Sequence, residues 1–530
     1  MMLAARRHLG HGFLNSAARL SSTGTMGHRL WGAAVDSPHL DTIFALSSGP
    51  ITKTGVAVIR LSGPSSQYCL SRLIRGKMPE PRRASLRKLY CPRTAEILDS
   101  ALVLNMPAPQ SFTGEDVVEL HVHGSRAVIL GVFAAFEHLD AAPDDAPLAS
   151  GRIGGIRAAE RGEFTRRAFD NGRMDLTEVE GLADLLAADT AQQRTQALRQ
   201  MEGHLRSVFE AWRAELIQCL AHTEAVIDFG DDDREDDVSD AAFDVLLPRI
   251  SGLLATMRGH LADGGRGELV REGVRVALVG PPNAGKSSLL NALARRPAAI
   301  VSPVAGTTRD VVEVRMDLGG IACLVSDTAG LRHEAGGVDA IEVEGMKRAR
   351  QAFGDAQLRV FVTDSADEGS RRDGEAMLAG LLGPEDATGE RYRIIRVLNK
   401  ADLAGAPAPD SGSGGGAEAY RISCVTGAGL PQLEAAIEVA IRSLLGDDSS
   451  PKDHLGGAPT IEGAIITRAR HRRHLVQCTL HLERFLYAGL PMDARAEEIR
   501  LAAMELGRIT GRVDVEELLD IIFRDFCIGK

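Results

Sequence analysis

A phosphate-binding loop is the clearest chemical signal in this chain. The apolar run Val274–Val279 reads as a buried strand, and Gly280-x-x-x-x-Gly285-Lys286-Ser287 follows it, before a segment typical of a helix. Glycines at this spacing let backbone N–H groups surround phosphates, the lysine reaches the β- and γ-phosphates, and the hydroxyl ligates Mg²⁺. The segment therefore predicts a site for a nucleoside triphosphate and a magnesium ion.

Three later motifs indicate which nucleotide is bound. SDTAG places Asp327 after a strand, where its carboxylate can hold the magnesium shell and Gly330 can face the γ-phosphate. NKAD supplies Asp402, a carboxylate that can accept two hydrogen bonds from guanine, which adenine cannot offer. SCV, at residues 423–425, resembles the loop that closes over guanine. The four motifs, in this order, resemble a translation-factor-type GTPase and favour GTP over ATP.

Two details concern the hydrolysis of that nucleotide. Ras-type GTPases follow DTAG with a glutamine that orients the attacking water, but Leu331 stands here and can neither donate nor accept a hydrogen bond. Another group must therefore place the water. Asn283 in the phosphate loop, together with VSPVAGTTRD downstream, offers oxygens that could cage a monovalent cation. Such a cation would neutralise charge where an arginine finger otherwise acts.

Composition sets the outer limits of function. The chain has 530 residues, a formal net charge of −11 and 4% aromatic residues, which argues against coating nucleic acid by charge alone. A local patch for a folded RNA stays open. The seven cysteines are scattered, with none at C-x-x-C spacing, so neither a zinc site nor a disulfide framework is favoured and a reducing compartment fits best. No apolar run has the length of a membrane span.

The elements that would position these motifs follow from periodicity. TGVAVIRL and DVVELHVHG read as strands, residues 176–250 show helical spacing, and residues 274–445 alternate strands with helices. Helices return at residues 465–487, 494–509 and 515–523. Because this last part is short for an independent core, we expect it to pack on the first helical part, with the α/β unit inserted between them. The acidic run DFGDDDREDD favours a solvated helix end or loop over a metal site.

The amino-terminal segment has the composition of an organellar transit peptide. Four arginines and several serines precede the first acidic residue, Asp36. The long apolar run of a secretory signal is missing. We expect a mitochondrial location, with a plastid as the alternative; an ordinary disordered tail is the other interpretation.

At this point the chain is similar to the MnmE (also TrmE) family of tRNA-modifying GTPases. Asn283 with AGTTRD, DTAGL and the closing CIGK carry the resemblance, which extends from Asp41 to Lys530. Two long blocks, residues 111–124 and 162–186, are similar to that family's folate-binding domain and first helix.

The resemblance implies a function. Family members form homodimers through their N-terminal domains and work with an FAD-containing, NADH-using partner of the MnmG type. Together they place an aminomethyl-type group, derived from glycine or taurine, on C5 of the wobble uridine of certain tRNAs. The carbon comes from a tetrahydrofolate, and GTP hydrolysis depends on potassium. The resemblance thus implies GTP, Mg²⁺, K⁺ and a one-carbon tetrahydrofolate as cofactors.

The resemblance also implies an organisation for this chain: a multidomain α/β and α protein. Residues 1–36 would be the transit peptide and 37–172 an α+β folate-binding and dimerisation domain. A helical domain would comprise residues 173–270 and 447–530. A P-loop GTPase domain, with a mostly parallel sheet and helices on both faces, would be inserted at 271–446.

The residues that the resemblance assigns fall into two sites. The nucleotide site would comprise Asn283, Ala284, Gly285, Lys286, Ser287, Ser288, Ser302, Gly306, Thr307, Thr308, Asp327, Thr328, Ala329, Gly330, Asn399, Lys400, Ala401, Asp402, Ser423, Cys424 and Val425. Among these, Ser287 and Thr308 match magnesium ligands, and potassium would be held by Asn283, Ser302, Val304 and Thr307. The folate site would comprise Arg60, Glu119, Arg173 and Lys530.

Two further residues would act in catalysis. Glu342 matches the glutamate that orients the water, with Glu334 and Glu344 as competitors. Cys527 would act in the one-carbon chemistry, either as a nucleophile or by a structural role.

Two alternatives remain. A ribosome-assembly GTPase would use a similar nucleotide domain as an RNA-binding switch, although it would be expected to carry a basic appendage. A nucleotide-gated scaffold would only recruit the flavoprotein.

Overall fold

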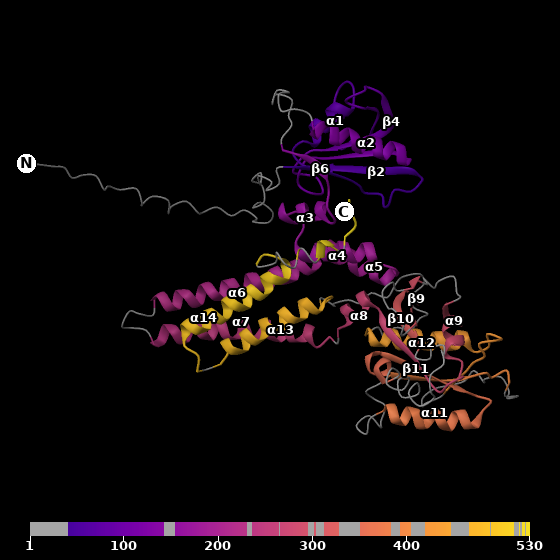
Figure 1. Cartoon of the computed structure of the whole chain (residues 1–530). Helices are drawn as coiled ribbons and strands as arrows, with labels where there is room; N and C mark the ends of the chain where they lie inside the picture. Colours follow the sequence, from indigo (N-terminus) through magenta and orange to yellow (C-terminus); the bar gives the residue numbers. More distant parts are fainter. Residues whose placement is uncertain are drawn as a thin grey trace, which may run out of the picture.

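The computed structural model describes residues 41–141, 154–229, 236–263, 265–294, 302–303, 312–327, 350–382, 393–403, 419–446, 466–487, 489–513, 519, 522–524 and 526–529. Two sheets lie on either side of a group of long helices (Figure 1). In the described part, no helix is both long enough and apolar enough to cross a membrane. The predicted transit peptide lies outside the described residues.

The first sheet has six strands in the order β3-β4-β5-β2-β1-β6. The strands are β1 (Thr42–Leu46), β2 (Thr54–Ser62), β3 (Ser85–Tyr90), β4 (Ile97–Met106), β5 (Val117–Gly124) and β6 (Ile156–Ala158). Every neighbouring pair is antiparallel except β1 and β6. The two strands expected around TGVAVIRL and DVVELHVHG are therefore β2 and β5, and they are direct neighbours.

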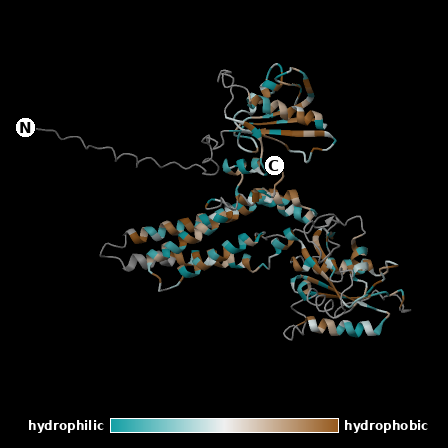
Figure 2. Ribbon diagram, viewed as in Figure 1, coloured by the Kyte–Doolittle hydropathy of each residue, from teal (hydrophilic) through white to brown (hydrophobic). Residues whose placement is uncertain are grey.

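Two helices cover one face of this sheet. They are α1 (Ser66–Leu73) and α2 (Arg126–Asp140), whose Leu70 and Phe136 are buried together with Ile59 and Leu120 of the strands. Residues alternate between the two faces of a strand, so the side chains at positions 60 and 119 point to the other face. Figure 2 shows apolar residues along these strands and on α2, and a hydrophilic α3 (Glu163–Asp170) below the sheet.

The long helices come from two distant parts of the sequence. The first part contains α4 (Leu176–Ala187), α5 (Ala191–Met201), α6 (His204–Phe229), α7 (Asp236–Leu261) and α8 (Arg266–Glu272); the second contains α13 (Ala469–Phe485) and α14 (Met492–Thr510). Phe209 and Ile250 share one core with Leu475 and Ile499. The last helices therefore pack on the first helical part, as expected. The acidic run 228–237 joins the end of α6 to the start of α7.

The second sheet is mixed and has seven strands in the order β13-β12-β11-β7-β10-β9-β8. They are β7 (Val274–Val279), β8 (Ser302–Pro303), β9 (Val312–Leu318), β10 (Ile321–Asp327), β11 (Leu358–Asp364), β12 (Arg393–Asn399) and β13 (Tyr420–Arg421). The neighbours from β13 to β10 are parallel, whereas β9 and β8 run antiparallel.

Helices lie on both faces of the second sheet. α9 (Lys286–Ala294) and α12 (Leu430–Leu444) share a core with Val276 and Val360, and α11 (Glu368–Leu381) packs near Ala277 and Phe361. Since the carboxyl ends of parallel strands meet at one edge of a sheet, the ends of β7, β10 and β12 lie along the same edge.

Candidate functional site

The loop between β7 and α9 is built around a buried lysine. Lys286 is 4% exposed, and its ammonium donates hydrogen bonds to the carbonyls of Gly280 and Pro281, each at 2.8 Å. Burial lowers the pKa of Lys286, and the nearby Asp327 carboxylate opposes that shift. A positive charge is thus held inside a ring of backbone, where phosphate oxygens would compensate for the water that it has lost.

Glycine is required at two positions of this loop. A Cβ on Gly280, whose φ is +154°, would lie 2.0 Å from the carbonyl oxygen of Val362. A Cβ on Gly285, at φ +94°, would lie 2.1 Å from the side-chain nitrogen of Asn399. The sequence spacing therefore reflects close approaches to β11 and to the end of β12.

A hydroxyl and a carboxylate meet at the start of α9. The hydroxyl of Ser287 donates to Oδ2 of Asp327, the last residue of β10, at 2.5 Å. Such oxygens are the ligands that Mg²⁺ prefers, usually together with phosphates and water. The pair fits the predicted magnesium site, whose other proposed ligand, Thr308, lies outside the described residues.

Asn399 joins the phosphate loop to the proposed guanine loop. It is 2% exposed, its amide donates to the carbonyl of Ala284 at 3.0 Å, and its oxygen accepts from the backbone N–H of Cys424 at 3.3 Å. The hydroxyl of Ser423 accepts from the backbone N–H groups of Val425 and Thr426, at 3.3 and 3.1 Å. One buried amide thus ties together three of the four motifs.

The neighbours of Asn399 shape the rest of this loop. Lys400 has a positive φ of 62° and its ammonium lies 2.7 Å from Asp364. The N–H of Ala401 bonds to the carbonyl of Ile422 at 3.0 Å, which leaves Asp402 exposed beside the site. Val425 is 86% exposed. An exposed carboxylate on an ordered backbone is suited to accept hydrogen bonds from a base.

Three further predicted nucleotide-site residues are described by the structure, and the others lie outside the described residues. Asn283 is exposed with φ 61°, Ser288 is exposed, and Ser302 begins the short β8, opposite Arg315 of β9. The remaining ones lie outside the described residues: Val304, Gly306, Thr307, Thr308, Thr328, Ala329, Gly330, Lys530, and Glu342 with its competitors Glu334 and Glu344.

A second polar cluster lies on the first sheet, on the face opposite α1 and α2. Arg60 of β2 is directly opposite Glu119 of β5, with Nε and a terminal nitrogen 2.9 and 2.8 Å from the same carboxylate oxygen. The second oxygen lies 3.4 Å from Nε2 of His121. The guanidinium stands over the rings of Phe112 and Phe164, at 5.5 and 5.8 Å.

Sequence reasoning missed three members of this cluster. His121 lies two residues after Glu119 on the same strand, so the period of two would have placed it on the same face. Phe112 and Phe164 come from a loop and from α3, and no local pattern points to them. Arg173 is separate: it is exposed, and its stem passes Gly114, whose added Cβ would lie 3.3 Å from Arg173 Cγ.

The carboxyl-terminal tail contacts the first sheet. Ile528 forms a β-bridge with Arg161, and the hydroxyl of Ser47 donates to the carbonyl of Gly529 at 3.0 Å. Gly529 has φ 93°, and a Cβ there would lie 2.4 Å from the carbonyl of Leu46. Leu46 pairs with Ile59, the neighbour of Arg60.

The tail therefore lies against the end of β1, which is the neighbour of the strand that carries Arg60. Cys527 is exposed there. Residues 528 and 529 contact Arg161, Ser47 and Leu46, and Phe526 packs with Leu176 and Val179; Lys530 lies outside the described residues.

Comparison with known proteins gives consistent matches over most of the chain. Residues 42–173 match the family model "GTP-binding protein TrmE N-terminus", and residues 176–527 match "MnmE helical domain". The tRNA modification GTPase MnmE of Parvibaculum lavamentivorans is 49% identical over 93% of this chain and 100% of its own length.

Two vertebrate proteins are similar as well. The mitochondrial 5-taurinomethyluridine-[tRNA] synthase subunit GTPB3 of Danio rerio is 45% identical over 93% of this chain and 94% of its own. Its Homo sapiens counterpart is 44% identical over 92% and 93%, respectively. Bacterial and mitochondrial relatives thus match to a similar degree.

Proposed function

The chain belongs to the MnmE/TrmE family of tRNA modification GTPases, and from this premise we propose that it hydrolyses GTP in the modification of tRNA uridines. One observation carries the nucleotide part of the proposal. Asn399 bonds both the phosphate loop and the Ser423 loop, which supports a single nucleotide site made by the two loops together.

During hydrolysis, different residues of this chain would bind the phosphates, hold the magnesium ion and position the attacking water. Lys286 and the backbone of the phosphate loop would bind phosphates, Ser287 and Thr308 would hold Mg²⁺, and Asp327 would orient its shell. Mg²⁺ would neutralise charge between the phosphates. Glu342 would position the attacking water, because Leu331 cannot.

Potassium belongs to this proposal as well. Asn283, Ser302, Val304 and Thr307 would hold K⁺, which would supply the positive charge of an arginine finger. The exposed amide of Asn283, held at positive φ beside the phosphate loop, supports this role.

The second site would bind a one-carbon tetrahydrofolate. A pterin presents a donor edge that a carboxylate can bind and a flat ring that can lie against aromatic side chains. Glu119 and the half-buried Phe112 fit these two needs, and Arg60 orients the Glu119 carboxylate. Arg173 and Lys530 would meet the carboxylates of the folate, while Cys527 would act on the carbon transferred. This folate chemistry would supply one carbon to C5 of the wobble uridine.

The remaining expectations complete the proposal. A homodimer would work with an FAD-containing partner of the MnmG type, and the group added would derive from taurine or glycine. The names of the vertebrate relatives favour taurine and a mitochondrial location, with a plastid as the alternative. The GTPase unit, 271–446, would be inserted between helical parts 173–270 and 447–530, after a transit peptide at 1–36 and the folate domain at 37–172.

Nucleotide specificity tests the first part of the proposal. In Asp402→Asn, the carboxylate that accepts from guanine becomes an amide that can donate to the C2 carbonyl of xanthine. We expect GTP affinity to fall at least tenfold and XTP affinity to rise, measured by fluorescence titration, while wild type prefers GTP to ATP. Equal affinity of wild type for GTP and ATP would refute a guanine site; the exposed Asp367→Asn of the same unit is the control.

A further inference from the structure

Helix α4 touches the tail at one end and the GTPase unit at the other. Leu176 and Val179, in its first turn, pack with Phe523 and Phe526 of the tail. In its last turns, Oδ1 of Asp184 accepts hydrogen bonds from Arg468 at 2.7 Å and from Arg271 of α8 at 3.2 Å. α8 leads directly into β7 and the phosphate loop. A single helix of 12 residues thus spans the distance, about 18 Å at 1.5 Å per residue.

α4 and α5 form a closely packed hairpin. A Cβ on Gly181 would lie 2.8 Å from the backbone nitrogen of Met201, so a larger residue would force the helices apart. The amide of Gln200 donates to the carbonyl of Thr177 at 2.8 Å. A capping box between Asp175 and Glu178 fixes the start of α4. The hairpin therefore moves as one body.

The same hairpin is fixed to the last helices by a buried charge. Glu180 is 2% exposed and lies 3.0 Å from Arg470 and 2.8 Å from His471 of α13. The Arg470 charge and the hydrogen bond with His471 hold the pKa of Glu180 at about 2 against the effect of its burial. Arg470 also donates to the carbonyls of Arg508 and Ile509, at 2.8 and 3.1 Å, where α14 ends. The chain that leads from the end of α14 to the tail therefore starts next to the α4–α5 hairpin.

The other side of the hairpin contacts the GTPase sheet through polar groups. Asp189, between α4 and α5, forms an ion pair with Arg315 of β9 at 3.3 Å. The amide of Gln193 donates to the carbonyl of Arg271 at 2.9 Å. In sequence, β9 follows residues 301–311, which include the proposed potassium and magnesium ligands, and its neighbour β10 ends at Asp327. The contact is therefore made by strands that flank the proposed catalytic loops.

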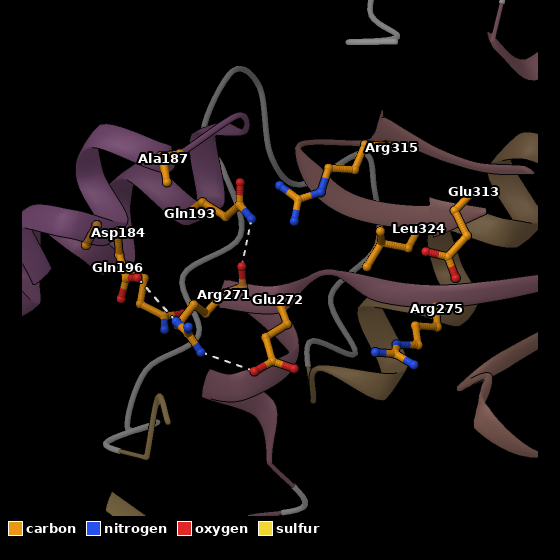
Figure 3. A pocket seen from close by; sticks show the side chains of 12 residues that line it. Asp184, Ala187, Gln193, Gln196, Arg271, Glu272, Arg275, Glu313, Arg315 and Leu324 are labelled. Atoms are coloured by element: carbon orange, nitrogen blue, oxygen red, sulfur yellow. Dashed lines mark hydrogen bonds and ion pairs between the residues drawn. The ribbon is translucent and has the colours of Figure 1, made fainter. Parts of the chain in front are cut away.

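A cleft of about 360 Å³ separates the hairpin from this part of the sheet. Figure 3 shows Asp184, Gln193 and Arg271 on one side and Arg315 and Glu313 on the other. The Arg315 and Asp189 side chains are 40% and 36% exposed, so their pair alone contributes little stability. Arg271, which is bonded to Asp184 and Gln193, supplies the more buried part of the contact. Polar contacts of this kind resemble transient interfaces between domains, which permit relative motion.

We infer that the α4–α5 hairpin is a lever through which the nucleotide state of the GTPase unit alters the position of the tail. Asp184 and Asp189 are its positioning residues: they touch no substrate and act through Arg271 and Arg315. When β9 or α8 shifts, the ion pairs move the far end of the hairpin, and Leu176 and Val179 carry Phe523 and Phe526 with them. This inference rests on the proposed function, because it assigns a purpose to hydrolysis at a site remote from the tail.

Hydrogen exchange of the carboxyl-terminal peptide tests the lever directly. Exchange is measured in the full chain with GDP and with GDP plus aluminium fluoride, for wild type, Asp189→Asn and Asp184→Asn. We expect nucleotide-dependent exchange at residues 522–529 in wild type and at least a threefold smaller difference in both variants. GTP hydrolysis should stay within about twofold of wild type, while tRNA modification per GTP hydrolysed falls.

Two variants control this experiment. Glu375→Gln removes an ion pair of similar length, 3.2 Å to Arg396, on the far side of the GTPase unit and should change nothing. The charge exchange Asp189→Arg with Arg315→Asp should restore at least half of the difference, which a merely structural role would not predict.

The outcomes separate the two proposals. If wild type neither hydrolyses GTP nor supports modification, the proposed function fails. If both activities are present but tail exchange ignores the nucleotide, or Asp189→Asn leaves that response intact, the lever alone is wrong. Asp189 lies at the surface, so its variant decides the matter even if Asp184→Asn does not fold.

Discussion

At the scale of single residues, the side chains of the proposed sites are brought together by segments that are far apart in the sequence. Arg60 and Glu119 are 59 residues apart, yet they form a pair because β2 and β5 are neighbours in register. Cys527 reaches the same sheet only because Gly529 passes the carbonyl of Leu46 at positive φ, where a Cβ would lie at 2.4 Å. A glycine is thus what permits the tail to lie against β1.

Cys527→Ser should abolish tRNA modification and leave GTP hydrolysis nearly unchanged. The side chain is exposed and serine is close to cysteine in size, so the loss would come from the sulfur's nucleophilicity and not from packing. Phosphate release and the wobble-uridine content of tRNA are measured for the same variant. Normal modification would reduce Cys527 to a structural residue.

GTP hydrolysis should be stimulated by potassium, and Asn283→Ala should remove most of that stimulation. The reason is the proposed cation cage, to which Asn283 contributes an amide oxygen. Turnover is compared in matched KCl and NaCl, with Asn291→Ala, an exposed asparagine of α9 outside the proposed site, as the control. Equal rates of wild type in the two salts would rule out the cage.

At the scale of elements, α4 begins with a capping interaction made by Asp175, a carboxylate whose ionised form is disfavoured by burial. The Asp175 side chain accepts from the N–H of Glu178 at 2.8 Å, while its other oxygen is buried without a hydrogen-bond partner among the described residues. Burial raises the pKa of Asp175 to about 6, and the neighbouring Glu178 adds to the shift. The cap that begins the helix is therefore sensitive to pH.

The raised pKa of Asp175 determines the direction in which the stability of the protein changes with pH. A carboxyl whose pKa is higher in the folded than in the unfolded protein contributes stability below its unfolded pKa, and loses it as the pH rises to about 6. The shift corresponds to about 3 kcal/mol at most. Asparagine also caps helices but does not ionise.

We therefore expect Asp175→Asn to gain stability relative to wild type between pH 4.5 and 7.5. The midpoints of urea unfolding, followed by helical circular dichroism, measure this gain, and Asp367→Asn at the exposed start of α11 is the control. A constant difference across this pH range would contradict the assignment.

Elements with strong local signals were predictable. β7 spans Val274–Val279 as expected, because a continuous apolar run between charged and glycine-rich segments has few alternatives. The meeting of Ser287 with Asp327 followed from motif order and from the parallel arrangement of β7 and β10.

Other features depend on contacts between distant segments. The rings of Phe112 and Phe164 over Arg60, and the Asp189–Arg315 pair, join parts of the chain whose local patterns carry no sign of one another. No local sequence pattern links the tail to the GTPase unit, whereas α4 touches both.

At the scale of the whole molecule, the helical part stands between two chemical sites. The first sheet carries the proposed folate cluster and receives the tail, and the second carries the phosphate loop. These sites are in different units (Figure 1). A protein that uses GTP to modify tRNA needs both sites and a connection between them.

Nucleoside mass spectrometry of tRNA tests this account most directly. Cells that lack the protein are complemented with wild type, with Lys286→Ala, which removes the buried phosphate-site cation, or with Glu119→Gln, which weakens the second site. We predict that the modified wobble uridine is restored by wild type alone, and that Glu119→Gln still hydrolyses GTP in vitro. Unchanged wobble uridines in cells without the protein, alongside a defect in ribosome assembly, would contradict the account and favour the ribosome-assembly alternative.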